Sequence, residues 1–289
     1  MPLPVDIANA AALAALLEAS VEKPGSVTPT KSFADLEYSD FLNAALSIRP
    51  HMAKAARRGA LAADSAIGLD EIGIGKIIYD AFEPGGSVAR RKVNVNFGIV
   101  LMFVPLAAAA GYGGTSLRKS LKAVLRDATP TDTVWIYKAM RKCDLGGMRL
   151  RGGGLSGLDV YSDAALTKIR REGITPLDVF RKSAGIDRLA SEWVSGYKIC
   201  FECSKKIELG GDSILKAFLG MLSKYPDTLI ARKAGLKEAE KVSAMARQAL
   251  NGRRSVASLD SYLRSKGNKL NPGTTCDLTA TALFLKAMG

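Results

Sequence analysis

A stretch of small polar residues, NPGTT at 271–275, precedes an apolar helical run at the end of the chain. Asn271 is a natural N-cap, Pro272 suits the first helical position, and Gly273 has no side chain to obstruct a ligand. The free amides and the dipole of such a helix N-terminus favour an anion. Capping alone explains the Asn and Pro, but it does not require Gly-Thr-Thr and then Asp277, so the stretch favours an added anion site.

Two other segments combine glycine or turn residues with charged side chains. GGMRLRGGGLSG places Arg149 and Arg151 among bare backbone amides, which suits a polyphosphate, although an exposed loop explains the segment equally well. PDTLIARKAG places Asp227 one helical turn before Arg232 and Lys233. That spacing can hold a metal and the phosphate that the metal bridges. Taken alone, the spacing is more typical of a charge pair on a surface.

Standard catalytic and nucleotide motifs are absent. GIGK at 73–76 hints at a Walker loop, but the motif requires Gly where Asp70 stands and Ser or Thr where Ile77 stands. The only histidine is His51, in a helical run, and it is more typical of packing or a surface position than of a catalytic triad. Cys200 and Cys203 form one CxxC, which lacks the further ligands of a zinc site.

The elements that must position these segments are predicted to be helices almost throughout. Helical spacing or helix-forming composition covers residues 5–20, 39–58, 70–82, 98–111, 131–142, 189–207, 214–222, 237–250 and 255–266. Turn-rich loops lie between them, and we find neither a composition break nor an internal repeat. The sequence therefore predicts one all-α domain over residues 1–289, whose glycine-rich loops form a nucleotide pocket.

The charge balance indicates an anionic partner. The 289 residues carry 41 Lys and Arg against 28 Asp and Glu, a formal charge of +13. The basic residues are spread in short pairs, aromatic residues make up only 7%, and no known RNA- or DNA-binding module is present. These features argue against sequence-specific binding of nucleic acid and favour a solvated basic surface. Acidic lipid and phosphorylated small molecules stay open as anionic partners.

The apolar segments do not predict a membrane protein. The N-terminus lacks the basic region of a signal peptide. The most apolar window, residues 98–111, falls short of the roughly 20 residues that span a bilayer and predicts a buried helix, with a kink expected at Pro105. Four cysteines of mixed spacing are typical of reduced thiols, so we expect a cytoplasmic protein.

Five segments, in order along the chain, resemble the triphosphoribosyl-dephospho-coenzyme A synthase family. ALLEASVEKPGSV is similar to E-x-S-x-x-x-K-P-G-x-V, DLEYSDFL to D-M-D-x-x-x-F-[LI], and VNVNFG to N-T-H-K-G. PDTLIARKAG resembles D-T-N-x-x-x-R-G-G, and NPGTTCDLTA resembles S-P-G-G-S-A-D-L-L-A. The matching positions are Glu18, Ser20, Lys23, Pro24, Gly25, Asp35, Glu37, Asn94, Gly98, Asp227, Thr228, Arg232, Gly235, Pro272, Gly273, Asp277 and Leu278.

The resemblance implies a glycosyl transfer that uses ATP as the ribosyl donor. A ribose hydroxyl of 3′-dephospho-coenzyme A, or of a similar nucleotide-like alcohol, attacks C1′ of ATP, and adenine leaves. A carboxylate would stabilise the oxocarbenium charge, and a base would take the hydroxyl proton. The triphosphate would need Mg²⁺ together with cationic or amide donors.

The resemblance also implies the site residues. The candidates for base, charge stabiliser or metal ligand are Glu18, Asp35 and Glu37, and the metal candidates are Asp227 and Asp277. The candidates for binding the nucleotide and its phosphates are Lys23, Gly25, Asn94, Asn96, Arg149, Arg151, Thr228, Arg232, Lys233, Gly273, Thr274 and Thr275.

The chain departs from the family pattern at two places. The family's Thr-His-Lys is Val95-Asn96-Phe97 here, and the His before the paired acids is Phe33. The sequence therefore resembles the divergent, archaeal-type branch. Three alternatives stay open: an ATP-using phosphoribosyl-type transferase of another cofactor pathway, a non-catalytic nucleotide-binding helical protein, and an RNA-associated protein. A homodimer is also open, since apolar helices can pack against a second subunit.

Overall fold

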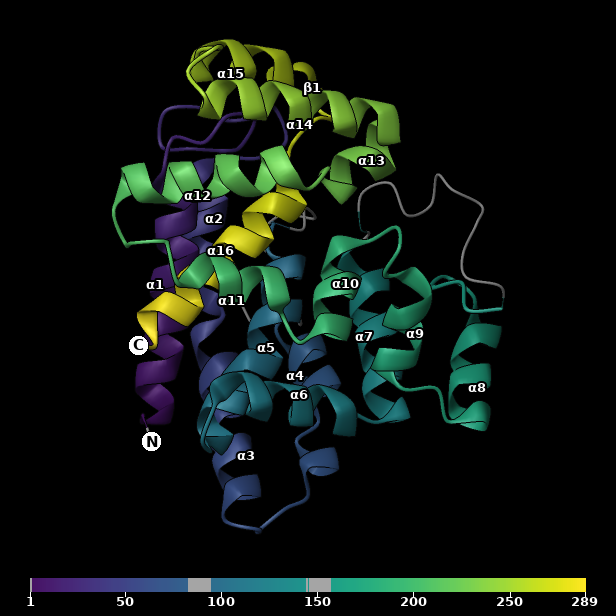
Figure 1. Cartoon of the computed structure of the whole chain (residues 1–289). Helices are drawn as coiled ribbons and strands as arrows, with labels where there is room; N and C mark the ends of the chain where they lie inside the picture. The colour runs from purple at the N-terminus through teal and green to yellow at the C-terminus, as the bar shows by residue number, and fades with distance from the viewer. Residues whose placement is uncertain (1, 83–94, 144, 146–156) are drawn as a thin grey trace.

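The computed structural model describes residues 2–82, 95–143, 145 and 157–289. Over these ranges the chain is helical, with one short strand, so the predicted all-α class is confirmed (Figure 1). The elements in chain order are α1 (Pro4–Ser20), α2 (Tyr38–Ser47), α3 (Arg49–Ala63), the 3₁₀ turn η1 (Leu69–Glu71), α4 (Ile74–Asp80), α5 (Phe97–Tyr112), α6 (Leu117–Asp127), α7 (Pro130–Cys143), α8 (Asp163–Glu172), α9 (Pro176–Ser183), α10 (Arg188–Ser195), α11 (Lys198–Ser204), α12 (Gly211–Lys224), α13 (Thr228–Ala234), α14 (Leu236–Leu250), α15 (Val256–Arg264), β1 (Ser265–Asn268) and α16 (Gly273–Ala287).

Helix α5 is the central element, and it is buried along nearly its whole length. Its partner α3 approaches closely because both helices carry small residues at the contact. A Cβ at Gly59 would overlap the carbonyl oxygen of Ala108, and a Cβ at Gly111 would overlap that of Ala56. The two backbones are therefore in direct contact, and both glycines are required there.

The remaining helices surround this pair (Figure 1), and the described residues form three hydrophobic cores. Helices α1, α4, α6 and α16 pack on α3 or α5 and share the main hydrophobic core. Helices α12, α14 and α15 enclose a second core, and α7 and α8 enclose a third with residues 158–160. The first residues of α5, 97–101, lie at a cavity that residues of α13 and α16 and residues of α7 and α9 also line.

Two predicted helices are split. Residues 39–58 form α2 and α3, because Pro50 lacks the N–H of a helix interior and starts a new helix instead. Residues 189–207 form α10 and α11, separated by Gly196 at φ 66° and Tyr197 at φ 56°. Both residues are in the left-handed region, which a continuous helix excludes.

Among the described residues, glycine-bearing loops meet at the pocket only in part. The segments 22–32 and 224–235 contribute lining residues such as Ser26 and Thr228 to the cavity described below, whereas residues 113–116 follow the C-terminal end of α5, away from that cavity. The glycine segments at 83–94 and 146–156 lie outside the described residues.

The apolar window at 98–111 forms the predicted buried helix, with Pro105 inside it. In the described part of the chain, no single helix is both long enough and apolar enough to cross a membrane. Only α5 and α6 taken together meet that test, and they are bent by 116°.

Candidate active site

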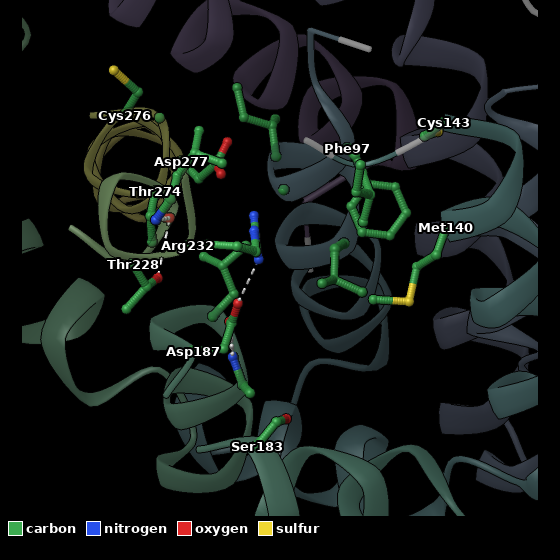
Figure 2. A pocket seen from close by; sticks show the side chains of 18 of the residues that line it. Phe97, Met140, Cys143, Ser183, Asp187, Thr228, Arg232, Thr274, Cys276 and Asp277 are labelled. Atoms are coloured by element: carbon green, nitrogen blue, oxygen red, sulfur yellow. Dashed lines mark hydrogen bonds and ion pairs between the residues drawn. The ribbon is translucent and has the colours of Figure 1, made fainter. Parts of the chain in front are cut away.

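A cavity of about 960 Å³ opens at the N-terminal end of α5 (Figure 2). Its walls come from α1, α2, α5, α7, α9, α10, α13 and α16, together with lining residues within 26–36, 158–161, 186–187 and 268–271 and the single residues Val95 and Leu145. Charged and hydroxyl side chains from α13 and α16 lie on one side in Figure 2, and Phe97, Met140 and Cys143 lie on the other. We name these two sides the charged end and the apolar end.

The charged end is built where α13 meets the N-terminus of α16. Thr228 and Thr274 hydrogen-bond through their hydroxyls at 3.2 Å, which fixes the two helix starts against each other. Arg232 extends from α13 into the cavity and pairs with Asp187 at 3.2 Å. About a quarter of each of these two side chains is exposed, so this guanidinium is accessible to an anion in the cavity.

The carboxylate of Asp277 lies against the first turn of α5. A Cβ at Gly98 would overlap this carboxylate, which explains the glycine at that position. No hydrogen bond to the carboxylate is found within the described ranges. Burial raises the pKa of Asp277 well above its ordinary value, and the carboxylates of Glu18 and Asp187 add to the shift. Arg232 opposes it. A proton or a cation would relieve this crowding of negative charge.

Asp227 has a different role, because it caps two helices. One carboxylate oxygen accepts from the amides of Leu229 at 2.9 Å and Ile230 at 3.0 Å, at the start of α13. The other accepts from the amide of Thr275 at 2.7 Å and from its hydroxyl at 2.8 Å, at the start of α16. The side chain is buried and does not line the cavity. This geometry argues against the predicted roles of Asp227 as a metal ligand and of Thr275 as a phosphate donor.

The start of α16 differs from the predicted capping by one residue. The helix begins at Gly273 and its N-cap is Pro272, so Asn271 precedes the cap and lines the cavity instead. Gly273 and Thr274 also line the cavity, as an anion site at this N-terminus requires.

Glu18 and Lys23 form a buried ion pair behind the cavity. The ammonium lies 3.2 Å from a carboxylate oxygen of Glu18 and also donates to the backbone carbonyls of Glu18 and Val21. The Lys23 side chain is fully buried and does not line the cavity, so a direct contact with phosphate is not supported. Glu18 does line it. Lys23 therefore compensates the charge of a cavity carboxylate.

Gly25 acts on the fold rather than on the cavity wall. It has φ 73°, and a Cβ there would come within 2.7 Å of Leu263 on α15. Its amide donates to Asp260 at 2.8 Å. These contacts hold residues 24–28 against α15, next to the lining residues Ser26 and Val27. Gly25 itself does not line the cavity, which argues against its predicted contact with the nucleotide.

Asp35 is held by a chain of hydrogen bonds that reaches across the charged end. The ammonium of Lys233 donates to the side-chain oxygen of Asn268 at 2.8 Å, and the Asn268 amide donates to Asp35 at 2.8 Å. All three residues line the cavity. Burial and the neighbouring Arg232 lower the pKa of Lys233. The second acid of this motif, Glu37, occupies the N-cap of α2 and does not line the cavity.

The apolar end lies between α5, α7 and α9. Its apolar lining residues are Val95, Phe97, Leu101, Ile136, Met140, Cys143, Leu145, Leu158, Val160, Pro176, Val179 and Phe180. Three hydroxyl groups in this region donate to backbone carbonyls: Tyr137 to Leu158 at 3.0 Å, Thr133 to Ile174 at 2.8 Å, and Ser183 to Val179 at 3.3 Å. Burial raises the pKa of Cys143 to about 12, so its thiol stays protonated.

The structure brings eight of the predicted site residues to the cavity: Glu18, Asp35, Thr228, Arg232, Lys233, Gly273, Thr274 and Asp277. It places six others elsewhere: Lys23, Gly25, Glu37, Asn96, Asp227 and Thr275. Asn96 is the buried residue that precedes α5. Asn94, Arg149 and Arg151 lie outside the described residues, and their predicted roles stay predictions.

Sequence reasoning missed Asp187 and Asn268, which hold Arg232 and Asp35 in place. Asp187 caps α10 by accepting from the amide of Ala190 at 3.0 Å, and an Asp before a helical run is a signal that could have been read. No local signal marks Asn268, whose partners are far away in the sequence.

The residues fit Mg²⁺ only in part. In the described part of the chain, no three His, Cys, Asp or Glu side chains form a metal-binding group. Mg²⁺ in nucleotide sites needs only one or two carboxylates, since the substrate phosphates and water complete its shell. Asp277, with Glu18 nearby, meets that requirement, whereas the oxygens of Asp227 are already engaged.

The four cysteines are free thiols. Cys200 and Cys143 are buried, and Cys203 and Cys276 are partly buried. The hydroxyl of Ser26 and the thiol of Cys276 lie 3.2 Å apart at the cavity wall.

Comparison with known proteins gives the family. No curated protein matches the chain. Among solved structures, one from Archaeoglobus fulgidus, provisionally named a triphosphoribosyl-dephospho-coA synthase, superposes with a TM-score of 0.59. It is 24% identical, and the match covers 82% of this chain and 96% of that one, so it supports the fold. The family model for ATP:dephospho-CoA triphosphoribosyl transferase matches residues 4–289. With a match over almost its entire length, the chain belongs to this family of transferases.

Proposed function

We propose that the protein transfers the 5-triphosphoribosyl group of ATP to a ribose hydroxyl of 3′-dephospho-coenzyme A or a similar nucleotide-like alcohol, with release of adenine. One observation carries this proposal beyond the family match. The same end of one cavity combines two cations, Arg232 and Lys233, with the carboxylates of Glu18, Asp35 and Asp277. Triphosphate binding needs the cations, and chemistry at C1′ needs the carboxylates.

The reaction exchanges one bond to C1′ for another. The acceptor oxygen forms a bond to C1′ of the ATP ribose, and the bond from C1′ to N9 of adenine breaks. The hydroxyl proton leaves through a base, and a proton is returned to the departing adenine. The products are free adenine and an acceptor that carries ribose 5-triphosphate. No oxidant or further reactant is required.

The geometry favours different tasks for the two remaining catalytic candidates. Asp35 is the exposed carboxylate, fixed by a single hydrogen bond from Asn268, and we assign it as the base. Glu18 is buried and its charge is balanced by Lys23, so we assign it to stabilising the positive charge that develops at C1′. The positions of Arg232, Lys233 and the first amides of α16 support binding of the triphosphate.

We further propose that Mg²⁺ is held by Asp277, with Glu18 beside it, and by the ATP phosphates. The ion would supply charge neutralisation for the triphosphate when bound. Asp277, whose carboxylate lies against Gly98, would be the residue that holds this ion, while Arg232 would hold the phosphates from the side of α13.

The test is adenine release from ATP and Mg²⁺, measured by chromatography with and without 3′-dephospho-coenzyme A, together with mass spectrometry of the acceptor. We expect adenine that depends on the acceptor and an adduct with the mass of one triphosphoribosyl group. Asp35→Asn should lower the rate by about 100-fold or more, as expected for loss of a general base. Glu37→Gln, in the same motif but outside the cavity, should stay within about twofold of the unchanged protein. Equal losses in the two variants would contradict the assignment of Asp35.

The free thiols support a cytoplasmic location, which we propose on that basis. We also propose a homodimer, in which exposed apolar side chains such as Leu13 on α1, at 43%, and Leu46 on α2, at 54%, would pack against a second subunit. Light scattering of the purified protein tests it, and a monomer mass at micromolar concentration would contradict it.

A further inference from the structure

We infer that the apolar end binds the aliphatic pantetheine arm of a coenzyme A-like acceptor, and thereby selects this acceptor over plain nucleotides. The inference rests on the proposed function and assigns the half of the cavity that the transfer chemistry does not use. The ligand class is a nucleoside diphosphate whose terminal phosphate is esterified with an aliphatic amide chain.

The distribution of charge orients the ligands in the cavity. Among the described lining residues, Arg232 and Lys233 are the only cations, and both lie at the charged end. We therefore place the phosphates at the charged end and an uncharged part of a substrate at the apolar end. Donor and acceptor both contain adenosine and phosphates, so the arm is the acceptor's one distinct part.

The hydrogen-bonding state of the apolar end favours the arm over a nucleobase. The hydroxyls of Tyr137, Thr133 and Ser183 already donate to backbone carbonyls, and their oxygens can still accept. Adenine could donate to these oxygens through its amino group, but its ring nitrogens are acceptors, and none of these hydroxyls has a proton left for them. The two amide N–H groups of the arm are donors and match these oxygens.

The apolar surface matches the rest of the arm. Phe97, Met140 and Cys143 face the cavity together (Figure 2), and Val160 and Val179 also line this end. These apolar side chains can cover the geminal methyl groups, which precede the first amide of the arm, and the methylenes that lie between its two amides. Removing such groups from water is favourable, whereas a phosphate placed against the same wall would lose its hydration without compensation. Because its thiol stays protonated, Cys143 behaves here as a small apolar side chain.

Met140 is the position from which to test the assignment. It is half-buried on α7 and labelled in Figure 2, so its side chain reaches the cavity while part of it is accessible. Met140→Glu places a charge where the arm would lie, and Met140→Leu is the matched control. Tyr161→Glu, from the facing segment, repeats the test if Met140→Glu does not fold.

The experiment is calorimetric titration of the whole protein with three ligands: 3′-dephospho-coenzyme A, the β-methyl ester of ADP, and ATP with Mg²⁺. The methyl ester keeps the adenosine and the charge of the diphosphate but lacks the arm. We expect the unchanged protein to bind dephospho-coenzyme A at least about tenfold more tightly than the methyl ester, which is the size of discrimination that an apolar pocket gives. Met140→Glu should remove this preference and leave the Kd of the methyl ester and of ATP within about twofold.

Two results would overturn the inference. Equal affinity of the unchanged protein for dephospho-coenzyme A and the methyl ester would show that the arm is not recognised. A loss of ATP affinity in Met140→Glu as large as the loss for dephospho-coenzyme A would place a nucleobase at the apolar end instead. Because binding is measured without turnover, an arm preference with no adenine release would overturn the proposed reaction and leave this inference standing.

Discussion

Two regions of the molecule each hold a carboxylate against the first turn of a helix, and the two behave differently. At the junction of α13 and α16, Asp227 accepts four hydrogen bonds and is closed off from the cavity. At the start of α5, Asp277 faces the cavity, no hydrogen bond to its carboxylate is found in the described ranges, and other carboxylates lie nearby. Both residues match family motifs. The difference shows that one acid is a structural connection and the other is available to a ligand.

The comparison also explains why the charged end can be preorganised. The fully bonded Asp227 fixes the starts of α13 and α16 relative to each other. Arg232 on α13 and Gly273 on α16 are then presented to the cavity by a rigid junction. A site that binds a triphosphate benefits because these groups need little reorganisation when the ligand arrives.

The strongest test of the difference is Asp227→Ala. It leaves the buried donors of two helix starts without their acceptor, so we expect the free energy of unfolding to fall by roughly 3 to 5 kcal/mol. Urea denaturation followed by circular dichroism measures this. Asp227→Asn, which keeps one acceptor oxygen, should recover part of the loss. A decrease below about 1 kcal/mol would mean that Asp227 is not the connection described here.

Asp277→Asn should give the opposite pattern. Replacing a carboxyl group whose charged form is crowded and buried should raise stability at pH 7 by on the order of 1 kcal/mol, while the rate of adenine release falls about 100-fold. Thermal unfolding and the chromatographic assay measure the two effects in one preparation. If stability falls as it does for Asp227→Ala, the contrast between the two acids disappears.

Gly273 tests whether the α13–α16 junction also binds a ligand. Gly273→Glu places a carboxylate at the start of α16, where we predict phosphate, and should weaken ATP binding by about 30-fold or more without unfolding the protein. Gly273→Ala is the control, since its Cβ would meet only the end of the Leu229 side chain, at 2.7 Å, which can shift. ATP affinity is measured by calorimetry. If it were unchanged in Gly273→Glu, the N-terminus of α16 would not be the site that binds the phosphates.

The raised pKa of Asp277 predicts how Mg²⁺ binding depends on pH. The folded protein without ligand holds a proton on Asp277 that the unfolded chain has lost, so stability falls as pH rises from the unfolded toward the folded pKa. Mg²⁺ must displace the same proton, so the half-saturating Mg²⁺ concentration should fall as pH rises, by up to about tenfold per unit. Asp277→Asn should show no such slope. If the half-saturating Mg²⁺ concentration of the unchanged protein did not vary with pH, Asp277 would not be a ligand of the metal.

The sequence predicted the helical class and the segments that meet at the cavity, because helical spacing and turn residues are local signals. Thr131–Lys142 and Lys237–Leu250 agree with α7 and α14 to within a residue. The same local signals failed at Gly196 and Tyr197, where two left-handed residues interrupt a run of helix formers.

The matching motifs identified important positions better than they identified roles. Lys23, Gly25 and Asp227 resemble binding residues in the sequence, yet the structure uses them for an ion pair, a close backbone contact and a double cap. A motif does not distinguish a residue that contacts the ligand from one that supports the contact. Asn268 shows the reverse, since its importance depends on partners more than 30 residues away, Lys233 at 35 and Asp35 at 233.

The glycine contact between α3 and α5 has a consequence for motion. With Gly59 and Gly111 in place, the two backbones touch, and α5 cannot slide or tilt without displacing α3. The part of the cavity wall that α5 forms is therefore expected to stay in place when substrates bind. Any closing on the substrates would come from another part of the wall, such as residues 28–37, which are held by two isolated bridges and a few side-chain hydrogen bonds.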